Sequence, residues 1–209
     1  MSTPSHPEQP GYKGKSNTFS QDIQLANLSA RVPEKVARGV FATGVLVLQG
    51  ANEFILDFVL RMNPPYQVVS RVVLPINLVP QLIDALKTNL DNYKNTFGSA
   101  PPPLPQPQQQ QPPAAPPSID QIYEDLKMSD EVMAGSYANS VMVVHTASEF
   151  GLEFISNFYP KAVIAARVFL SAPQVPVFLG SMTQSWQNFQ AKMRQQQQPP
   201  PPAQFPPAT

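Results

Sequence analysis

Charged side chains interrupt otherwise apolar runs at four positions of this 209-residue chain. Asp57 and Arg71 stand in neighbouring β-like segments, and Glu153 and Arg167 stand in two similar segments further on. If the chain turns back at residues 63–65, Asp57 lies opposite Arg71, and the later segments give the same pairing. The predicted chemistry is either a cross-strand ion pair that fixes strand register or a polar contact to a ligand on the sheet.

These charges recur because the chain repeats itself. A shift of 96 positions, without a gap, places residues 36–97 on residues 132–193. The identical pairs include Gly39 and Gly135, Ala42 and Ala138, Val45 and Val141, Glu53 and Glu149, Phe54 and Phe150, Leu56 and Leu152, Phe58 and Phe154, and Pro64 and Pro160. Two copies of one folding unit explain this pattern. Each copy has only about sixty residues, a size at which a lone domain is marginal, so we expect the copies to stabilise each other.

The remaining titratable residues form no catalytic or metal-binding pattern. The sequence has no cysteine, which removes thiolate nucleophiles, disulfides and thiolate metal ligands. Its two histidines are far apart, and the first copy carries Gln49 where the second carries His145. Glu53 and Glu149 flank turns without a neighbouring base. We therefore expect no enzymatic activity, no catalytic residue, no cofactor and no bound metal.

Hydrophobic periodicity predicts three strands and one helix in each copy. In the first copy, residues 39–49, 53–62 and 66–75 are runs of β-branched and aromatic residues separated by turn-forming residues. From Asn77 to Phe97 the apolar residues recur at spacings of three and four, which is the period of a helix.

Local signals set the ends of the first helix. Asn77 is its expected N-cap, Pro80 falls in its first turn and Gly98 ends it. In the second copy the corresponding stripe contains Trp186, which we expect to pack in the core.

Both faces of the predicted strands are largely apolar. A helix covers only one face of a three-stranded sheet, so the other face needs the other copy as its partner. At about 25 cal/mol per Å², burying several hundred Å² between the copies would supply a good fraction of a small domain's stability. We expect an α+β fold of two β-β-β-α repeats with antiparallel sheets, packed as a pseudo-two-fold intramolecular dimer.

Composition divides the chain into five parts. They are a disordered head over residues 1–21, a first repeat over 22–98 that opens with a short edge strand at 22–32, a Pro/Gln-rich linker over 99–117, a second repeat over 118–194, and a disordered Pro/Gln tail over 195–209. Residues 118–121 form a capping-box pattern that predicts a short leading helix with Ile122, Tyr123 and Leu126 on one side. The proline-rich tracts are either spacers or docking peptides.

Charge and hydropathy limit the expected partners and cellular location of the protein. Lys plus Arg number 14 and Asp plus Glu number 14, so no net field attracts nucleic acid or an anionic membrane. The N-terminus lacks the apolar core of a secretory signal, and no apolar run is long enough to span a membrane. We expect a cytoplasmic protein with no membrane contact.

The two copies together resemble a bacterial family known only as a domain of unknown function. The shared elements are a Glu-Phe-x-x-Asp-Phe strand at 53–58 and 149–154, an Arg-Val-x-Leu strand end at 71–75 and 167–171, an opening at 41–43 and 137–139, and an amphipathic helix at 82–93. Gly151 and Glu153 depart from this pattern. The resemblance implies no activity, but it implies that single-repeat relatives form homodimers and that this chain is such a dimer fused in tandem.

Two functional hypotheses of different class follow. The first is a non-enzymatic protein-interaction or assembly module, with a chaperone-like variant by analogy of fold to export chaperones that hold extended polypeptides. The alternative is a single-stranded nucleic-acid-binding protein that uses a sheet face, which requires basic residues interleaved with aromatics. The basic residues are scattered, so we favour a protein partner over nucleic acid.

Overall fold

The computed structural model describes residues 30–104, 118–158 and 160–197. The first repeat contains α1 (Glu34–Ala37), β1 (Val40–Ala42), β2 (Gly44–Gln49), β3 (Glu53–Leu60), β4 (Tyr66–Pro75), the short 3-10 helix η1 (Ile76–Leu78) and α2 (Val79–Phe97). The second contains α3 (Ile119–Glu124), β5 (Leu126–Lys127), α4 (Asp130–Met133), β6 (Ser136–Tyr137), β7 (Ser140–His145), β8 (Glu149–Ser156), β9 (Val163–Ser171) and α5 (Gln174–Gln197). The predicted mixed α+β class is confirmed.

Each repeat supplies three antiparallel strands in the predicted order. β2, β3 and β4 pair in sequence, and β7, β8 and β9 pair in the same way. Asp57 lies opposite Arg71 and Glu153 opposite Arg167, as the sequence predicts. Both third strands carry a bulge. Phe58 and Val59 face Ser70 and Val68, which leaves Val69 without an opposite residue, and Ala165 is its counterpart in β9.

The prediction of purely antiparallel sheets is wrong, because the first repeat sends β1, and the second repeat sends β5 and β6, into the sheet of the other repeat. β1 pairs in parallel with β9, and β6 pairs in parallel with β4. The described chain therefore forms a four-stranded sheet in the order β1-β9-β8-β7, and a five-stranded sheet built on β2-β3-β4 with β5 and β6 at its edge. Both sheets are mixed.

The exchange requires a break in the segment predicted as one strand over residues 39–49. At Thr43 the backbone bends, its N–H donates to the Val59 carbonyl at 2.8 Å, and its side-chain oxygen accepts from the Arg61 N–H at 2.8 Å. Asn139 anchors the equivalent bend, with its N–H bonded to the Ile155 carbonyl at 3.0 Å. A polar side chain that binds the neighbouring strand thus separates β1 from β2 and β6 from β7.

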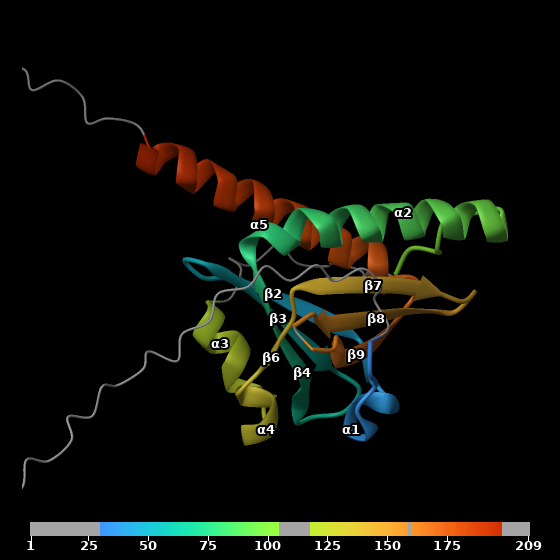
Figure 1. Ribbon diagram of the computed structural model, residues 1–209, viewed down its shortest axis with the longest axis horizontal. Helices are drawn as coiled ribbons and strands as arrows, with labels where there is room; N and C mark the ends of the chain where they lie inside the picture. Colours follow the sequence, from blue (N-terminus) through green and yellow to red (C-terminus); the bar gives the residue numbers. More distant parts are fainter. Residues whose placement is uncertain (1–29, 105–117, 159, 198–209) are drawn as a thin grey trace, which may run out of the picture.

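The helices exchange as well. α2 packs against β7 of the second repeat, and α5 packs against β2 of the first. Phe54 on β3 lies 5.9 Å from Phe189 and 6.4 Å from Trp186, both on α5, while Tyr93 on α2 stacks 5.6 Å from Phe150. The predicted core position of Trp186 is confirmed. In Figure 1, α2 and α5 cross over one side of the sheets, and α1, α3 and α4 lie on the other.

One hydrophobic core contains residues of both repeats. Its largest fully buried side chains include Phe54, Phe58, Phe150 and Phe154, and the rings of Phe58 and Phe154 lie 5.6 Å apart. Burial of each such ring contributes about 2 kcal/mol relative to exposure. Because these rings meet across the repeats, the two copies share the burial that a unit of this size lacks on its own.

Helix ends agree with the sequence at three places and differ at two. Pro80 lies in the first turn of α2, Gly98 caps it with φ of 79°, and Ser118 and Gln121 form the predicted capping box. Asn77 is not the N-cap, because residues 76–78 form a 3-10 turn that makes Leu78 the capping residue, without a side-chain bond. α5 runs to Gln197, past the predicted boundary at Arg194, since glutamine is a good helix former.

Several predictions fall on residues outside the described ranges. They are the head over 1–21, most of the edge strand over 22–32, the linker from 105 onward and the tail from 198 onward. Of the edge strand, Arg31 alone is seen to pair, in parallel with Val163. No helix in the described part of the chain is both long and apolar enough to cross a membrane.

Candidate interaction groove

The predicted pair of Asp57 and Arg71 forms with two matched hydrogen bonds. Arg71 Nε and one terminal nitrogen each lie 2.7 Å from a different carboxylate oxygen, and Asp57 is fully buried. Tyr123 of α3 donates its hydroxyl to the same carboxylate. The hydrogen bond to Asp57 raises the pKa of Arg71, and burial followed by the bond to Asp57 raises the pKa of Tyr123 to about 12. The three side chains form a closed polar cluster that ties α3 to the sheet.

The equivalent pair in the second repeat is looser. Arg167 reaches Glu153 through one nitrogen at 2.7 Å, and its other terminal nitrogen donates to the Ala37 carbonyl at 2.6 Å. The Arg167 Nε is buried and has no hydrogen-bond partner in the described chain. The glutamate side chain is longer than that of aspartate and meets the guanidinium in a different orientation. The bidentate contact of Asp57 with Arg71 is therefore not repeated.

The sequence placed Tyr123 on the apolar side of a short helix and did not connect it to Asp57. The two residues are 66 positions apart, outside the repeated register. A tyrosine on the inner side of a short helix could have indicated this contact, because a buried tyrosine hydroxyl needs a hydrogen-bond partner and Asp57 interrupts an apolar strand.

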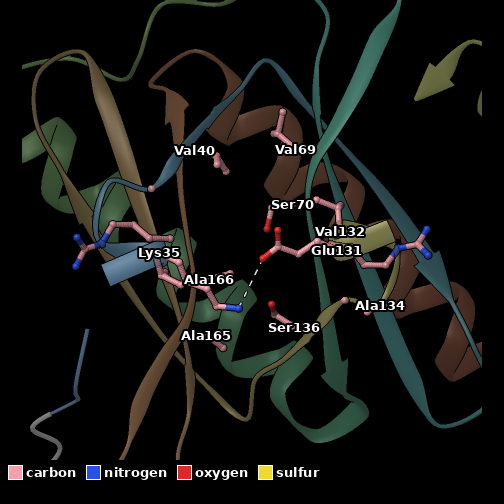
Figure 2. Close-up of a pocket in the computed structure, with 15 residues that line it drawn as sticks. Lys35, Val40, Val69, Ser70, Glu131, Val132, Ala134, Ser136, Ala165 and Ala166 are labelled. Carbon is pink, nitrogen blue, oxygen red and sulfur yellow. Dashed lines mark ion pairs between the residues drawn. The ribbon is translucent and has the colours of Figure 1, made fainter. Parts of the chain in front are cut away.

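A groove lies where the two repeats meet. It has a volume of about 490 Å³, and its lining residues come in pairs 96 positions apart, with Ala134 as the exception. Lys35 and Glu131, one such pair, reach across it from opposite sides and come within 3.7 Å (Figure 2). Both side chains are highly exposed, so this surface ion pair contributes at most about 1 kcal/mol. We call this cavity the central groove.

Two segments of unpaired strand edge border the central groove. On β4, β5 pairs with residues 66–67 and β6 with residues 72–73, so residues 69–71 have no strand on that side in the described chain. On β9, the backbone of Arg31 is hydrogen bonded to the backbone of Ala162 and Ile164, and pairing with β1 begins at Val168. Residues 165–167 therefore have no strand on that side in the described chain. All six residues line the groove.

The side chains that line the groove are mostly small, and its arginines are paired. Its two arginines are engaged by Asp57 and Glu153, and much of its remaining wall is made of glycine, alanine, serine and valine. His145 lies elsewhere, with Nδ1 3.2 Å from the Asn89 side chain and its ring 5.2 Å from that of Phe150. Among the described residues no group of three or more His, Asp or Glu side chains is placed to hold a metal.

The fold and the groove define a class of protein, a tandem-repeat α+β protein whose two copies exchange strands and helices. The chain belongs to the family described as Protein of unknown function (DUF3467), whose model matches it twice, over residues 4–100 and 105–195. The resemblance noted in the sequence, and its tandem duplication, are thereby confirmed. No curated protein and no solved structure matches the chain.

Proposed function

We propose that this protein is a non-enzymatic protein-interaction module, a pseudo-two-fold intramolecular dimer whose central groove binds an extended polypeptide segment of a partner. One observation carries the proposal. Residues 69–71 and 165–167, equivalent in the two repeats, present unpaired strand edge to a single groove. An open edge offers N–H and C=O groups to an added strand, which is a common mode of peptide recognition.

The size of the open edge sets the length of the segment. Three residues of each open edge, 69–71 and 165–167, line the groove, and an extended chain rises about 3.3 Å per residue, so the direct main-chain contact spans about 10 Å. The bulge residues Val69 and Ala165 lie at one end of these edges. Bulges twist an edge and limit its pairing, which favours a short, reversible contact over sheet-to-sheet aggregation.

The lining favours recognition through the main chain. Small side chains allow a partner backbone to approach the edges closely. The ion pair of Lys35 and Glu131 closes the mouth weakly, so a partner displaces it at little cost. Since Arg71 and Arg167 are already paired, the groove has no strong preference for one charge, which is consistent with the chaperone-like variant.

The nucleic-acid alternative has less support. Single-strand binders combine free basic side chains with aromatic platforms on which bases stack. The central groove has no aromatic residue in its lining as described, and its arginines are neutralised by carboxylates. A protein partner in the cytoplasm therefore stays the prediction that fits the groove.

Peptide binding tests the proposal. A panel of fluorescent unstructured peptides is titrated with the full chain, with Ala165→Trp, which fills the groove, and with Gln184→Trp, an exposed helix position outside it. We expect measurable anisotropy changes for the wild type and the control, and at least a tenfold weaker affinity for Ala165→Trp. Equal binding by all three proteins, or binding to none of the peptides, contradicts the proposal.

Two further measurements separate the variants of this function. Titration with single-stranded oligonucleotides at rising salt identifies a nucleic-acid binder if affinity falls steeply with salt. Light scattering of an unfolding client protein tests the chaperone-like variant, which predicts suppressed aggregation with the wild type and not with Ala165→Trp.

A further inference from the structure

A hollow lies on the face of the four-stranded sheet that is turned away from α2 and α5. Phe41, Phe169, Gly151 and Val144 stand opposite one another on successive strands, and all four line it. Its volume is about 390 Å³. Sites for small molecules are mostly apolar and enclose about 300–1,000 Å³, so this hollow is large enough for a small ligand.

Two glycines let the Phe169 ring lie close to the backbone. A Cβ at Gly151 would lie 3.4 Å from one edge of this ring, and a Cβ at Gly39 would lie 2.5 Å from its other edge. The ring is therefore held between two backbone segments that approach it because neither carries a side chain. A ring fixed in this way is a surface that needs little rearrangement before a ligand stacks on it.

The equivalent row of the five-stranded sheet is built differently. Its residues are Tyr137, Val73, Ile55 and Leu48. Tyr137 is as exposed as its counterpart Phe41, at 43% each, so the rows do not differ there. They differ at the next two positions, where Val73 replaces the Phe169 ring and the branched Ile55 stands in the place of Gly151. Only the row of the four-stranded sheet combines a second ring with a glycine beside it.

One carboxylate stands at the rim of the hollow. Glu149 is exposed and precedes Gly151 by two residues on β8, so both point to the same face of the sheet. The Thr146 hydroxyl donates to its Oε2 at 2.9 Å, which holds the carboxylate in place. Glu149 takes part in none of the ion pairs found among the described residues.

The charge of the lining comes from Glu149. His145 also borders the hollow, but its Nδ1 lies 3.2 Å from the side chain of Asn89 on α2, on the other side of the sheet. An apolar site with a single carboxylate at its rim is complementary to a ligand that has an apolar body and one positive charge.

We propose that this hollow, which we call the Gly151 site, binds a small aromatic monoamine. The ring of the ligand stacks on Phe169 between Phe41 and Val144, and its ammonium group pairs with Glu149. The Gly151 site shares no lining residue with the central groove, so the inference does not rest on the proposed function.

An amide-detected nuclear magnetic resonance titration of the full chain tests the site. The probes are tryptamine, indole-3-acetate with the same ring and the opposite charge, and pentylamine with the amine and no ring. The reporters are the amides of Val144, Gly151 and Phe169 and, for the equivalent row, those of Leu48, Ile55 and Val73. We expect saturable shifts with tryptamine in the first set alone, and affinities at least about fivefold weaker for the other two probes.

Two variants and a matched control locate the interaction. Gly151→Ile introduces the residue of the first repeat into the hollow and is expected to abolish the saturable shifts. The strand tolerates isoleucine better than glycine, and Val144, whose Cγ2 would lie 3.1 Å from the new Cβ, is 50% exposed and can turn away. Glu149→Gln should weaken tryptamine binding about threefold, as expected for an exposed ion pair, whereas the equivalent Glu53→Gln should leave it unchanged.

Several results would overturn the proposal. They are the absence of saturable shifts up to the solubility of tryptamine, shifts of equal size in both rows, equal affinities for tryptamine and indole-3-acetate, and full affinity in a folded Gly151→Ile. Equal affinities of Glu149→Gln and Glu53→Gln would do the same if Gly151→Ile does not fold. Shifts at Gly151 that follow the protein concentration and are unaffected by tryptamine would assign the hollow to a second copy of the chain, which also contradicts it.

Discussion

Asp57 and Glu153 occupy equivalent positions in the repeats and differ by one methylene group. Asp57 is fully buried and holds Arg71 through both carboxylate oxygens, whereas Glu153 meets Arg167 through a single nitrogen. The loss in free energy of unfolding when a carboxylate is removed depends on how many buried hydrogen-bond donors are left without an acceptor. Arg71 and Tyr123 would lose their shared partner, but Arg167 keeps the Ala37 carbonyl.

We therefore expect Asp57→Ala to lower the free energy of unfolding by about 3 kcal/mol, and Glu153→Ala by about 1 kcal/mol. Urea denaturation followed by circular dichroism measures both losses, and the single core predicts one cooperative transition. Equal losses for the two variants would show that the difference in hydrogen bonding has no energetic consequence.

Ionisation of the Tyr123 hydroxyl makes the free energy of unfolding depend on pH in the alkaline range. Its pKa is about 12 in the folded protein and about 10 when the chain is unfolded, so folding favours the neutral phenol. This contribution is complete below pH 10 and is lost as the pH rises from 10 to about 12. We expect wild-type stability to fall more steeply across this range than that of Tyr123→Phe.

Absorbance of tyrosinate provides an independent check. The difference between wild type and Tyr123→Phe isolates the titration of this one hydroxyl, which should have its midpoint near pH 12. Titration of Tyr123 near pH 10 would mean that the hydroxyl is free in solution and that α3 does not hold it against Asp57.

At the scale of elements, the strand exchange depends on two glycines. Gly39 and Gly135 precede β1 and β6 with φ of 65° and 71°. A Cβ at Gly39 would lie 2.5 Å from the Phe169 ring, and one at Gly135 would lie 3.2 Å from the Arg71 side chain. The crossing strand therefore needs both the left-handed backbone and the space that only glycine leaves.

Alanine substitutions separate these two requirements. Gly98 also has positive φ, at 79°, but nothing lies within 4 Å of its missing Cβ. We expect Gly98→Ala to cost about 1 kcal/mol for the backbone alone, and Gly39→Ala to cost about 2 kcal/mol or more because the Phe169 ring must also move. Urea midpoints compare the variants, and a loss at Gly39 no larger than at Gly98 argues against the close crossing.

At the scale of the whole molecule, the repeats are not separable domains. β1 and α2 of the first repeat complete the sheet and core of the second, and β6 and α5 do the same in return. Each half on its own would expose the phenylalanines that the other half covers. The exchanged elements therefore make folding of one half depend on the other.

Expression of residues 1–104 and 105–209 as separate chains tests this dependence. We expect neither half to be a folded monomer, and an equimolar mixture to regain the far-ultraviolet spectrum and cooperative unfolding of the intact chain as a one-to-one complex. Analytical ultracentrifugation gives the stoichiometry. A half that is monomeric and cooperatively folded contradicts the exchange.

Sequence patterns were enough to predict the tandem repeat, the α+β class, the three paired strands of each copy and the opposition of Asp57 and Arg71. These features follow from spacing along the chain, because strand and helix periods and hairpin register are local properties. The capping box at Ser118 and the ending of α2 at Gly98 were equally local.

The sheet and core that each element joins could not be predicted from the sequence and are seen in the folded chain. Residues 40–42 are as apolar as a strand that continues into 44–49, and nothing in their pattern distinguishes pairing with β3 from pairing with β9. The bend at Thr43, the bond from Tyr123 to Asp57 and the central groove all join residues far apart in sequence. The spacing of apolar residues along the sequence shows which face of a helix or strand is buried. Which other element covers that face depends on the free energy of the whole core.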